Sequence, residues 1–279
     1  IMRGRTIQIY MPDGNPRAIK ISEIMDSIVK AIYIPRNKLG EVSSIKGIET
    51  PGLYFLFGNE DEIGKPNLYI GEADPLLTRL KQHNANKEFW NVAIGFVSEK
   101  DNLNKAHIKF LENFACAEAK RINKCVLENS VTPTQSTLTD SERDFAYSFF
   151  EDLKILLSNL GYPIFLENKK DSKNIFICKG KDAYAEGLYN EEGMLVFKGS
   201  KAQVDESDSA GDWIKDIRKN LLNQGILFKE NGVFVFKEDY TFSSPSAAAA
   251  TVLGRSANGW TSWKTNEGVT LDKKYRKTN

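Results

Sequence analysis

The chain has few of the residues that build zinc sites or disulfide frameworks. Its three cysteines, Cys116, Cys125 and Cys178, form no CxxC pair and do not cluster with the only two histidines, His83 and His107. A structural zinc site needs closely spaced thiolate and imidazole ligands, and a disulfide framework needs paired cysteines in an oxidising compartment. We therefore expect neither feature, and we expect a reducing compartment, the cytoplasm.

Long apolar runs and a dominant charge are also missing. No apolar run approaches the roughly 20 residues of a membrane span, and no signal peptide is visible. Lysine and arginine total 38 against 37 aspartates and glutamates, so the formal net charge is +1. We expect no membrane partner. Any nucleic acid would have to bind local basic patches, with an affinity that falls as salt rises.

The composition is that of a globular protein with more than one domain. The chain has 279 residues, 41% of them hydrophobic and 27% charged, which suits roughly two domains of ordinary size. We predict an α+β fold: a small antiparallel or mixed sheet flanked by helices, then a second, smaller α+β domain. The predicted parts are an N-terminal strand and helix extension (1–46), a main domain (47–166), a polar linker (167–180) and a C-terminal accessory domain (181–279).

The extension is predicted from local patterns. Residues 6–11 alternate like a strand, and Ser22 is a suitable cap for a helix that runs to about Ala31. Residues 32–36 are predicted to be extended. The segment would add an edge or a lid to the main domain.

A hairpin at residues 52–71 organises the main domain. Gly52–Phe57 and Asn67–Gly71 are short aromatic and aliphatic runs separated by turn-forming residues. Since strands alternate their faces, Tyr54 and Tyr69 can bring two phenol groups to one patch. Gly71 lacks a side chain and permits close approach of backbone or ligand. The alternative is an ordinary hairpin with two core tyrosines.

A helix is predicted directly after the hairpin. Asp74 can cap its start, and Pro75 suits its first turn. On this helix Arg79 and His83 are i,i+4 neighbours and share a face.

A second helix, over about 103–121, carries a carboxylate inside its apolar stripe. This residue is Glu112, and a lone carboxylate among apolar neighbours costs several kcal/mol without a partner charge, a metal or a water-filled cleft. A salt-bridged glutamate and a metal ligand are both compatible with the pattern. His107 is expected to serve the helix start or to support the site from behind, not to bind metal.

Five features in this order and spacing resemble the GIY-YIG nuclease family. The first strand contains a Gly-Leu-Tyr motif that ends at Tyr54, and the second contains a Tyr-Ile-Gly motif that begins at Tyr69. The other three features are Arg79, ten residues after Tyr69, His83, four residues after Arg79, and the helical Glu112. The similarity runs from about Thr50 to Asn129.

The resemblance implies an endonuclease that hydrolyses phosphodiester bonds in DNA with one Mg²⁺ or Mn²⁺ ion. It implies Tyr69 as general base with Tyr54 orienting it, Arg79 as phosphate clamp, His83 near the leaving group, and Glu112 as metal ligand. These types suit the chemistry, because arginine matches phosphate geometry and a carboxylate holds a hard cation.

Two further residues and one departure accompany the resemblance. Tyrosine has an unperturbed pKa near 10, so it acts as a base only beside positive charge, which Arg79, the metal and Lys81 would supply. Lys81 is therefore a candidate for substrate binding. The resemblance implies Asn129 as another, because the family often places a supporting polar residue at this position. Some relatives carry a lysine directly after the Tyr-Ile-Gly strand, where this chain has Glu72, which leaves any role of that lysine open here.

The C-terminal part is similar to an uncharacterised domain that is often appended to nucleases of this family. The similarity covers about Lys181 to Arg276 and includes a Ser-Pro-Ser-Ala-Ala-Ala run and a Gly-Arg-Ser-Ala-Asn-Gly-Trp run. Two interpretations compete here. In one, two cations and two indoles bind nucleic acid; in the other, both tryptophans are buried and the cations are solvated. The residues concerned are Arg255, Trp260, Trp263 and Lys264.

The sequence thus favours a metal-dependent DNA endonuclease. The alternative is a non-cleaving nucleic-acid-binding adaptor on the same fold, in phage defence or DNA repair. RNA stays open as a partner, and the sequence does not define the oligomeric state.

Overall fold

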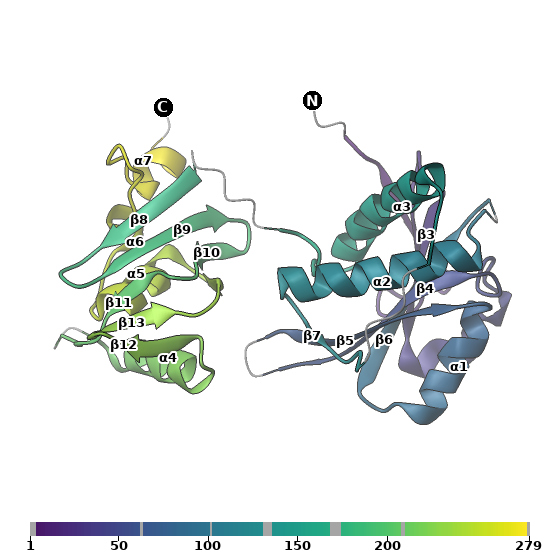
Figure 1. The fold of residues 1–279 in the computed structure, drawn as a ribbon, viewed down its shortest axis with the longest axis horizontal. Coiled ribbons are helices and arrows are strands. Elements are labelled where there is room, and N and C mark those ends of the chain that lie inside the picture. The colour runs from purple at the N-terminus through teal and green to yellow at the C-terminus, as the bar shows by residue number, and fades with distance from the viewer. Residues whose placement is uncertain are drawn as a thin grey trace. The chain divides into compact units, whose positions relative to one another are not determined.

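The computed structural model describes residues 4–61, 64–100, 102–130, 136–167, 174–207 and 210–277. The chain divides into two compact units, Ile1–Glu167 and Asn168–Asn279 (Figure 1). Each unit has its own sheet and helices, which confirms the α+β class. The division falls at the start of the segment 167–180 expected to be a linker, of which 168–173 lie outside the described residues, whereas Ile175–Lys179 form a strand of the second unit.

In the described part of the first unit, the strands form one sheet in the order β1-β2-β3-β6-β4-β5-β7. Neighbouring strands are antiparallel except β5 and β7, which are parallel. The strands are β1 (Ile7–Tyr10), β2 (Lys20–Ile24), β3 (Val29–Pro35), β4 (Gly52–Glu60), β5 (Pro66–Ala73), β6 (Trp90–Ser98) and β7 (Val126–Leu127). The predicted hairpin is the antiparallel β4–β5 pair.

Helices cover both faces of this sheet. They are the 3₁₀ helix η1 (Arg36–Ser44) and the α-helices α1 (Leu76–Asn86), α2 (Lys105–Ile122) and α3 (Asp140–Asn159). One hydrophobic cluster joins α2 and α3 to the sheet face that carries Phe55, and the other joins α1 and η1 to the face that carries Tyr54 and Leu56. The predicted alternation of side chains along β4 is therefore confirmed.

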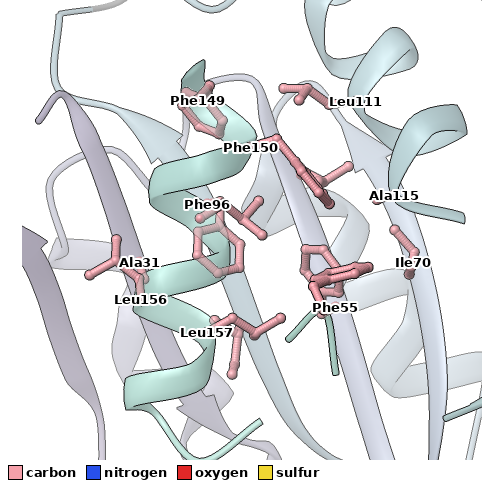
Figure 2. Packing of buried hydrophobic residues seen from close by; sticks show 14 of the residues in the cluster. Ala31, Phe55, Ile70, Phe96, Leu111, Ala115, Phe149, Phe150, Leu156 and Leu157 are labelled. Atoms are coloured by element: carbon pink, nitrogen blue, oxygen red, sulfur yellow. The ribbon is translucent and has the colours of Figure 1, made fainter. Parts of the chain in front are cut away.

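The larger core fixes the rotation of α2. Figure 2 shows Leu111 and Ala115 of α2 packed with Phe150 and with the sheet residues Phe55 and Ile70. Phe55 also meets the Phe96 ring edge-to-face at 5.5 Å between ring centroids. Because Leu111 and Ala115 are held in this core, Glu112 between them projects at its border.

The helix predicted from Ser22 to about Ala31 is wrong. This segment forms the β2–β3 hairpin, in which Ser22 and Ala31 are directly paired across the two strands. Ser27 N–H donates to the Ile24 carbonyl at 2.9 Å and closes the turn. The apolar spacing is compatible with a helix, but the β-branched isoleucines pack well on a pleated surface. The segment 1–46 thus contributes β1, β2 and β3 to the same sheet as the hairpin.

The cap predicted at Asp74 is also wrong. Pro75 takes the N-cap position of α1, without a side-chain cap. The Leu76 and Leu77 amides instead donate to the carbonyls of Thr50 and Ile48, at 3.2 and 2.9 Å. The chain leading into β4 therefore caps α1 through its backbone, a long-range contact that local sequence does not report.

The second unit contains a second sheet and four helices in its described ranges. Its strand order is β12-β13-β11-β9-β10-β14, and β8 pairs with β9. The strands are β8 (Ile175–Lys179), β9 (Tyr184–Asn190), β10 (Gly193–Val196), β11 (Lys201–Gln203), β12 (Leu227–Glu230), β13 (Val233–Phe236) and β14 (Tyr240–Phe242). The helices are α4 (Asp212–Asn223), α5 (Pro245–Leu253), α6 (Gly259–Ser262) and α7 (Leu271–Tyr275). The described range ends at residue 277.

The start of α5 has a local cause in the sequence. Ser244 caps the helix by accepting from the Ala247 amide at 3.1 Å, Pro245 follows in the first turn, and Gly254 ends the helix in the left-handed conformation. None of the helices in the described ranges has the length and apolar composition needed to cross a membrane.

Glycine is a steric requirement beside Tyr54. Both cross-strand neighbours of Tyr54 are glycines, Gly71 on β5 and Gly95 on β6. A Cβ at Gly71 would lie 2.2 Å from the Tyr54 hydroxyl oxygen, and one at Gly95 would lie 2.5 Å from a Leu76 methyl carbon. The Tyr54 ring therefore lies across β5 because Gly71 leaves room for it.

We expect Gly71→Ala to destabilise the protein by about 1–3 kcal/mol, the usual cost of overpacking a buried site. Gly40→Ala is the matched control, because a Cβ at Gly40 meets nothing within 4 Å. Urea unfolding followed by circular dichroism measures both. Equal midpoints for Gly71→Ala and Gly40→Ala would contradict the steric argument.

Candidate active site

The structure brings Tyr54 of β4 and His83 of α1 into direct contact. The Tyr54 hydroxyl and His83 Nε2 are 2.7 Å apart, and both side chains are buried. Burial, together with the nearby charges of Arg79 and Lys87, lowers the pKa of His83 to about 4, so the imidazole is neutral at pH 7. A neutral imidazole accepts or donates at Nε2 according to its tautomer.

Tyr54 keeps its proton. Burial first, and the adjacent Tyr69 phenol second, raise the pKa of Tyr54 well above its ordinary value, although a hydrogen bond from Arg79 opposes this shift. A protonated phenol that accepts from Arg79 has one proton to donate, and His83 Nε2 accepts it in the tautomer that leaves this nitrogen without a proton. Tyr54 thus connects Arg79 and His83 and is not suited to act as a base.

Tyr69 completes a cluster of three rings. Its ring centroid lies 6.2 Å from that of Tyr54, with the planes 26° apart, and 5.2 Å from that of His83. Lys87 Nζ lies 4.4 Å from the Tyr69 ring centroid. The two predicted tyrosines therefore share one patch, and the second is the less buried of the two.

Glu112 reaches this cluster around the outer edge of β5. The short β7 pairs only with Asn67 and Leu68, and beyond it the outward backbone groups of β5 are met by other partners. Asn129 pairs with Ile70 through both ends of its amide, at 3.0 and 2.7 Å. The Glu72 amide then donates to the Glu112 carboxylate. Asn129 therefore holds the strand that carries Tyr69, a structural contact rather than an open binding group.

The Glu112 carboxylate is half-buried and easily protonated. Burial first, then the charge of Glu72, raise its pKa from 4.5 to about 7, while the Glu72 amide and the Arg79 and Lys109 charges oppose this. Two carboxylates thus face each other at the end of β5. Glu72 stands at the position where some members of the GIY-YIG family carry a lysine.

A pocket of about 340 Å³ opens at this edge. Its lining comes from the end of β5, the first two turns of α1 and the first residue of α2, and consists of Glu72, Ala73, Asp74, Pro75, Thr78, Arg79, Gln82 and Lys105. Arg79 Nη1 also donates to Gln82 Oε1 at 3.1 Å, which steadies the guanidinium at the pocket.

Lys105 is a pocket residue that the sequence analysis missed. It begins α2 and lies seven residues before Glu112, so the two share a helix face. That spacing was the available signal. Lys81, predicted to bind substrate, is exposed on α1 two positions from Arg79 and is not part of the pocket lining. Positions two apart on a helix point to different faces.

The residues at this edge fit one hydrated divalent cation better than a fully protein-ligated metal. In the part of the chain that the structure describes, no group of three or more His, Cys, Asp and Glu side chains is arranged to hold a metal. Mg²⁺ keeps several waters and needs only one or two carboxylates. Glu112 and Glu72 offer two neighbouring carboxylates whose mutual repulsion a cation would relieve.

His107 serves the start of α2, as expected. The Asn104 side chain accepts from the His107 amide at 2.9 Å, and His107 Nδ1 accepts from the Asn104 amide at 3.3 Å. This reciprocal cap orients the helix that carries Lys105 and Glu112. The three cysteines are free and buried, so no disulfide forms among them.

The remaining predicted residues lie in the second unit. Arg255 and Lys264 are exposed there. Trp263 is fully buried, and its indole N–H donates to the Pro245 carbonyl at 3.1 Å. Trp260 is only partly buried. The interpretation that both tryptophans are buried therefore holds for Trp263 alone.

Comparison with known proteins identifies only the C-terminal part. Residues 176–275 match the model of a family described as a domain of unknown function, DUF4357. This range overlaps the segment 181–276 singled out from the sequence. No curated protein matches the chain, and no solved structure matches it.

We expect Glu112→Gln to stabilise the protein at pH 8 but not at pH 5. A carboxyl whose folded pKa is raised loses stability as pH rises from its unfolded value of 4.5 to about 7, because ionisation is disfavoured in the fold. Allowing for partial exposure, the gain should be about 1–2 kcal/mol at pH 8. Thermal unfolding at both pH values, with EDTA, measures it.

The control for this prediction has the opposite sign. Glu118 lies on the same helix, and its hydrogen bonds with Arg121 lower its pKa. Glu118→Gln should therefore leave stability unchanged or reduce it at pH 8. A melting temperature for Glu112→Gln that shows no pH-dependent gain over wild type would refute the buried-charge argument.

Proposed function

We propose that the first unit is a divalent-metal-dependent endonuclease that hydrolyses phosphodiester bonds in DNA, acting in the cytoplasm. The observation that carries the proposal is convergence at one sheet edge. Tyr54 and His83 are hydrogen-bonded, and Tyr69 packs beside them. Arg79 and Glu112 act electrostatically on the phenol of Tyr54. A pocket lined by Arg79 lies at this edge. These residue types match the order and spacing of the GIY-YIG nucleases.

The proposed reaction divides the work among these side chains. Arg79 would bind the phosphoryl oxygens through its guanidinium, where negative charge grows in the transition state. Tyr69, as the phenolate, would take a proton from the attacking water as the water oxygen forms a bond to phosphorus. The bond from phosphorus to the departing sugar oxygen breaks, and that oxygen takes up a proton from a second water molecule.

The second tyrosine and the histidine would position the reacting groups. Tyr54 accepts a hydrogen bond from Arg79 and contacts His83, so it fixes the position of the Arg79 guanidinium. Because the pKa of His83 is about 4, we favour the role of a neutral residue that orients Tyr54. The alternative role, a protonated acid beside the leaving group, is less favoured. Glu112, with Glu72 beside it, would hold the Mg²⁺ or Mn²⁺ ion. The bound cation supplies polarisation of the phosphate and charge stabilisation.

The proposal is tested by cleavage of supercoiled, linear and single-stranded DNA with Mg²⁺ or Mn²⁺. We expect wild type to cut, and Arg79→Ala, Tyr69→Phe and Glu112→Gln to lose activity by about 10²-fold or more, the scale for a lost transition-state contact. Glu112→Gln should still bind DNA, because it removes negative charge. Arg121→Ala, an exposed arginine of α2, is the control and should cut normally.

Two outcomes would count against the enzyme. If wild type binds DNA with every metal tested and never cuts it, the non-cleaving adaptor is favoured. If the Arg79 and Glu112 variants cut as well as Arg121→Ala, the site assignment is lost.

Lys105 should bind a phosphate next to the one that is cut. It shares the pocket with Arg79, and a lysine acts as a point charge toward phosphate. We expect Lys105→Gln to raise KM roughly 5–10-fold with a smaller change in kcat, on the scale of one charge-assisted contact. Lys109→Gln, on the same helix but outside the pocket lining, is the control. Equal KM values for the two variants would remove Lys105 from the site.

A further inference from the structure

The second unit carries a cluster of aromatic side chains from separate segments. Tyr189 is the second-last residue of β9, Trp260 lies in α6 and Tyr275 ends α7. Tyr189 meets Trp260 edge-to-face at 5.3 Å and Tyr275 edge-to-face at 5.4 Å between ring centroids. Tyr275 is 45% exposed, although it contacts two other aromatic rings, those of Phe176 and Tyr189. The cluster is therefore part core and part surface.

An arginine lies over the indole of this cluster. The guanidinium carbon of Arg276 is 3.5 Å from the Trp260 ring centroid, a contact stack. Arg276 is exposed, and among the residues described here it forms no salt bridge. Stacking on a ring holds a guanidinium in one orientation while its in-plane N–H groups stay available for hydrogen bonds.

The same surface is locally basic in a chain of nearly zero net charge. From Leu271 to Lys277 the sequence has four cations, at 273, 274, 276 and 277, and one acid, Asp272. Asp272 pairs with Lys277 at 3.1 Å. Lys274 Nζ lies 6.0 Å from the Tyr275 ring centroid. The charge of Glu191 also acts on Tyr275.

We propose that this surface, centred on Trp260, Tyr275 and Arg276, binds single-stranded nucleic acid. An exposed ring and a stacked guanidinium offer flat faces to unpaired bases, and the adjoining lysines meet phosphates. Paired bases keep their faces stacked on one another, so a duplex could use only the charges. The proposal concerns the second unit and does not depend on cleavage by the first.

The placement of the tryptophans differs from the sequence hypothesis. Trp263 cannot stack on a base, because it is fully buried and its N–H is bonded to the Pro245 carbonyl. Its role is to hold α6 against α5. The residues that replace it in the proposal, Tyr275 and Arg276, lie at the end of α7 and were not singled out from the sequence.

The test is fluorescence anisotropy of a labelled oligothymidylate with the full chain in EDTA, so that no metal-dependent cleavage interferes. We expect Arg276→Gln and Tyr275→Leu each to weaken binding roughly 5- to 50-fold, the range for loss of one stacking or cation contact. Arg276→Gln should also reduce the slope of log K against log salt by about 0.7. A duplex of the same length should bind more weakly.

Controls separate this surface from other effects. Trp213→Leu removes an exposed aromatic on α4, 48% exposed, and should leave the affinity unchanged. Circular dichroism confirms that each variant is folded. Repeating the Arg276→Gln measurement in an Arg79→Ala background shows whether the loss arises in the second unit, whatever the first unit does.

Three results would overturn the proposal. They are affinities of Arg276→Gln and Tyr275→Leu equal to that of Trp213→Leu, a Tyr275→Leu change that weakens duplex binding as much as single-strand binding, and a loss that disappears in the Arg79→Ala background. Absence of cleavage in the first unit would not bear on it, so the two proposals fail independently.

Discussion

The outer edge of β5 is the constraint on which the candidate site depends. A strand edge presents backbone groups that need partners, and here they are met in succession by β7, by the Asn129 amide and by the Glu112 carboxylate. Because β7 is only two residues long, the end of β5 stays open. A side chain from α2, which packs on one face of the sheet, can therefore reach residues of the other face.

The second constraint is the burial of Tyr54. Its ring lies on the α1 face of the sheet, where Gly71 leaves room for it, and its hydroxyl is in contact with His83. A buried phenol must find hydrogen-bond partners, and two residues of α1, Arg79 and His83, provide them. Packing and polar satisfaction thus hold the guanidinium beside the pocket in the free protein, which is the pre-organisation that the proposed phosphodiester hydrolysis would require.

The two units place their aromatic residues differently. In the first, the ring of Tyr54 is enclosed between α1 and the sheet, and its polar tip serves a network. In the second, Trp263 is enclosed, whereas Trp260 and Tyr275 stay partly at the surface with Arg276 over the indole. The same residue types therefore act as structural anchors or as exposed faces according to the elements packed on them.

Local sequence was sufficient wherever a pattern has a local cause. The β4–β5 hairpin, its alternation, the Ser244 cap of α5 and the pairing of Arg79 and His83 on one helix all follow from spacing over a few residues. Local patterns gave the wrong structure for residues 22–31. The apolar spacing there is compatible with a helix, whereas the β-branched residues favour strands, and the pairing of β3 with β6 stabilises the strand conformation. What required the tertiary structure were the contacts between distant segments: the capping of α1 by Ile48 and Thr50, the entry of Lys105 into the pocket, and the burial of Trp263 beside a partly exposed Trp260. Such contacts depend on how elements pack, and no short window of sequence contains both partners.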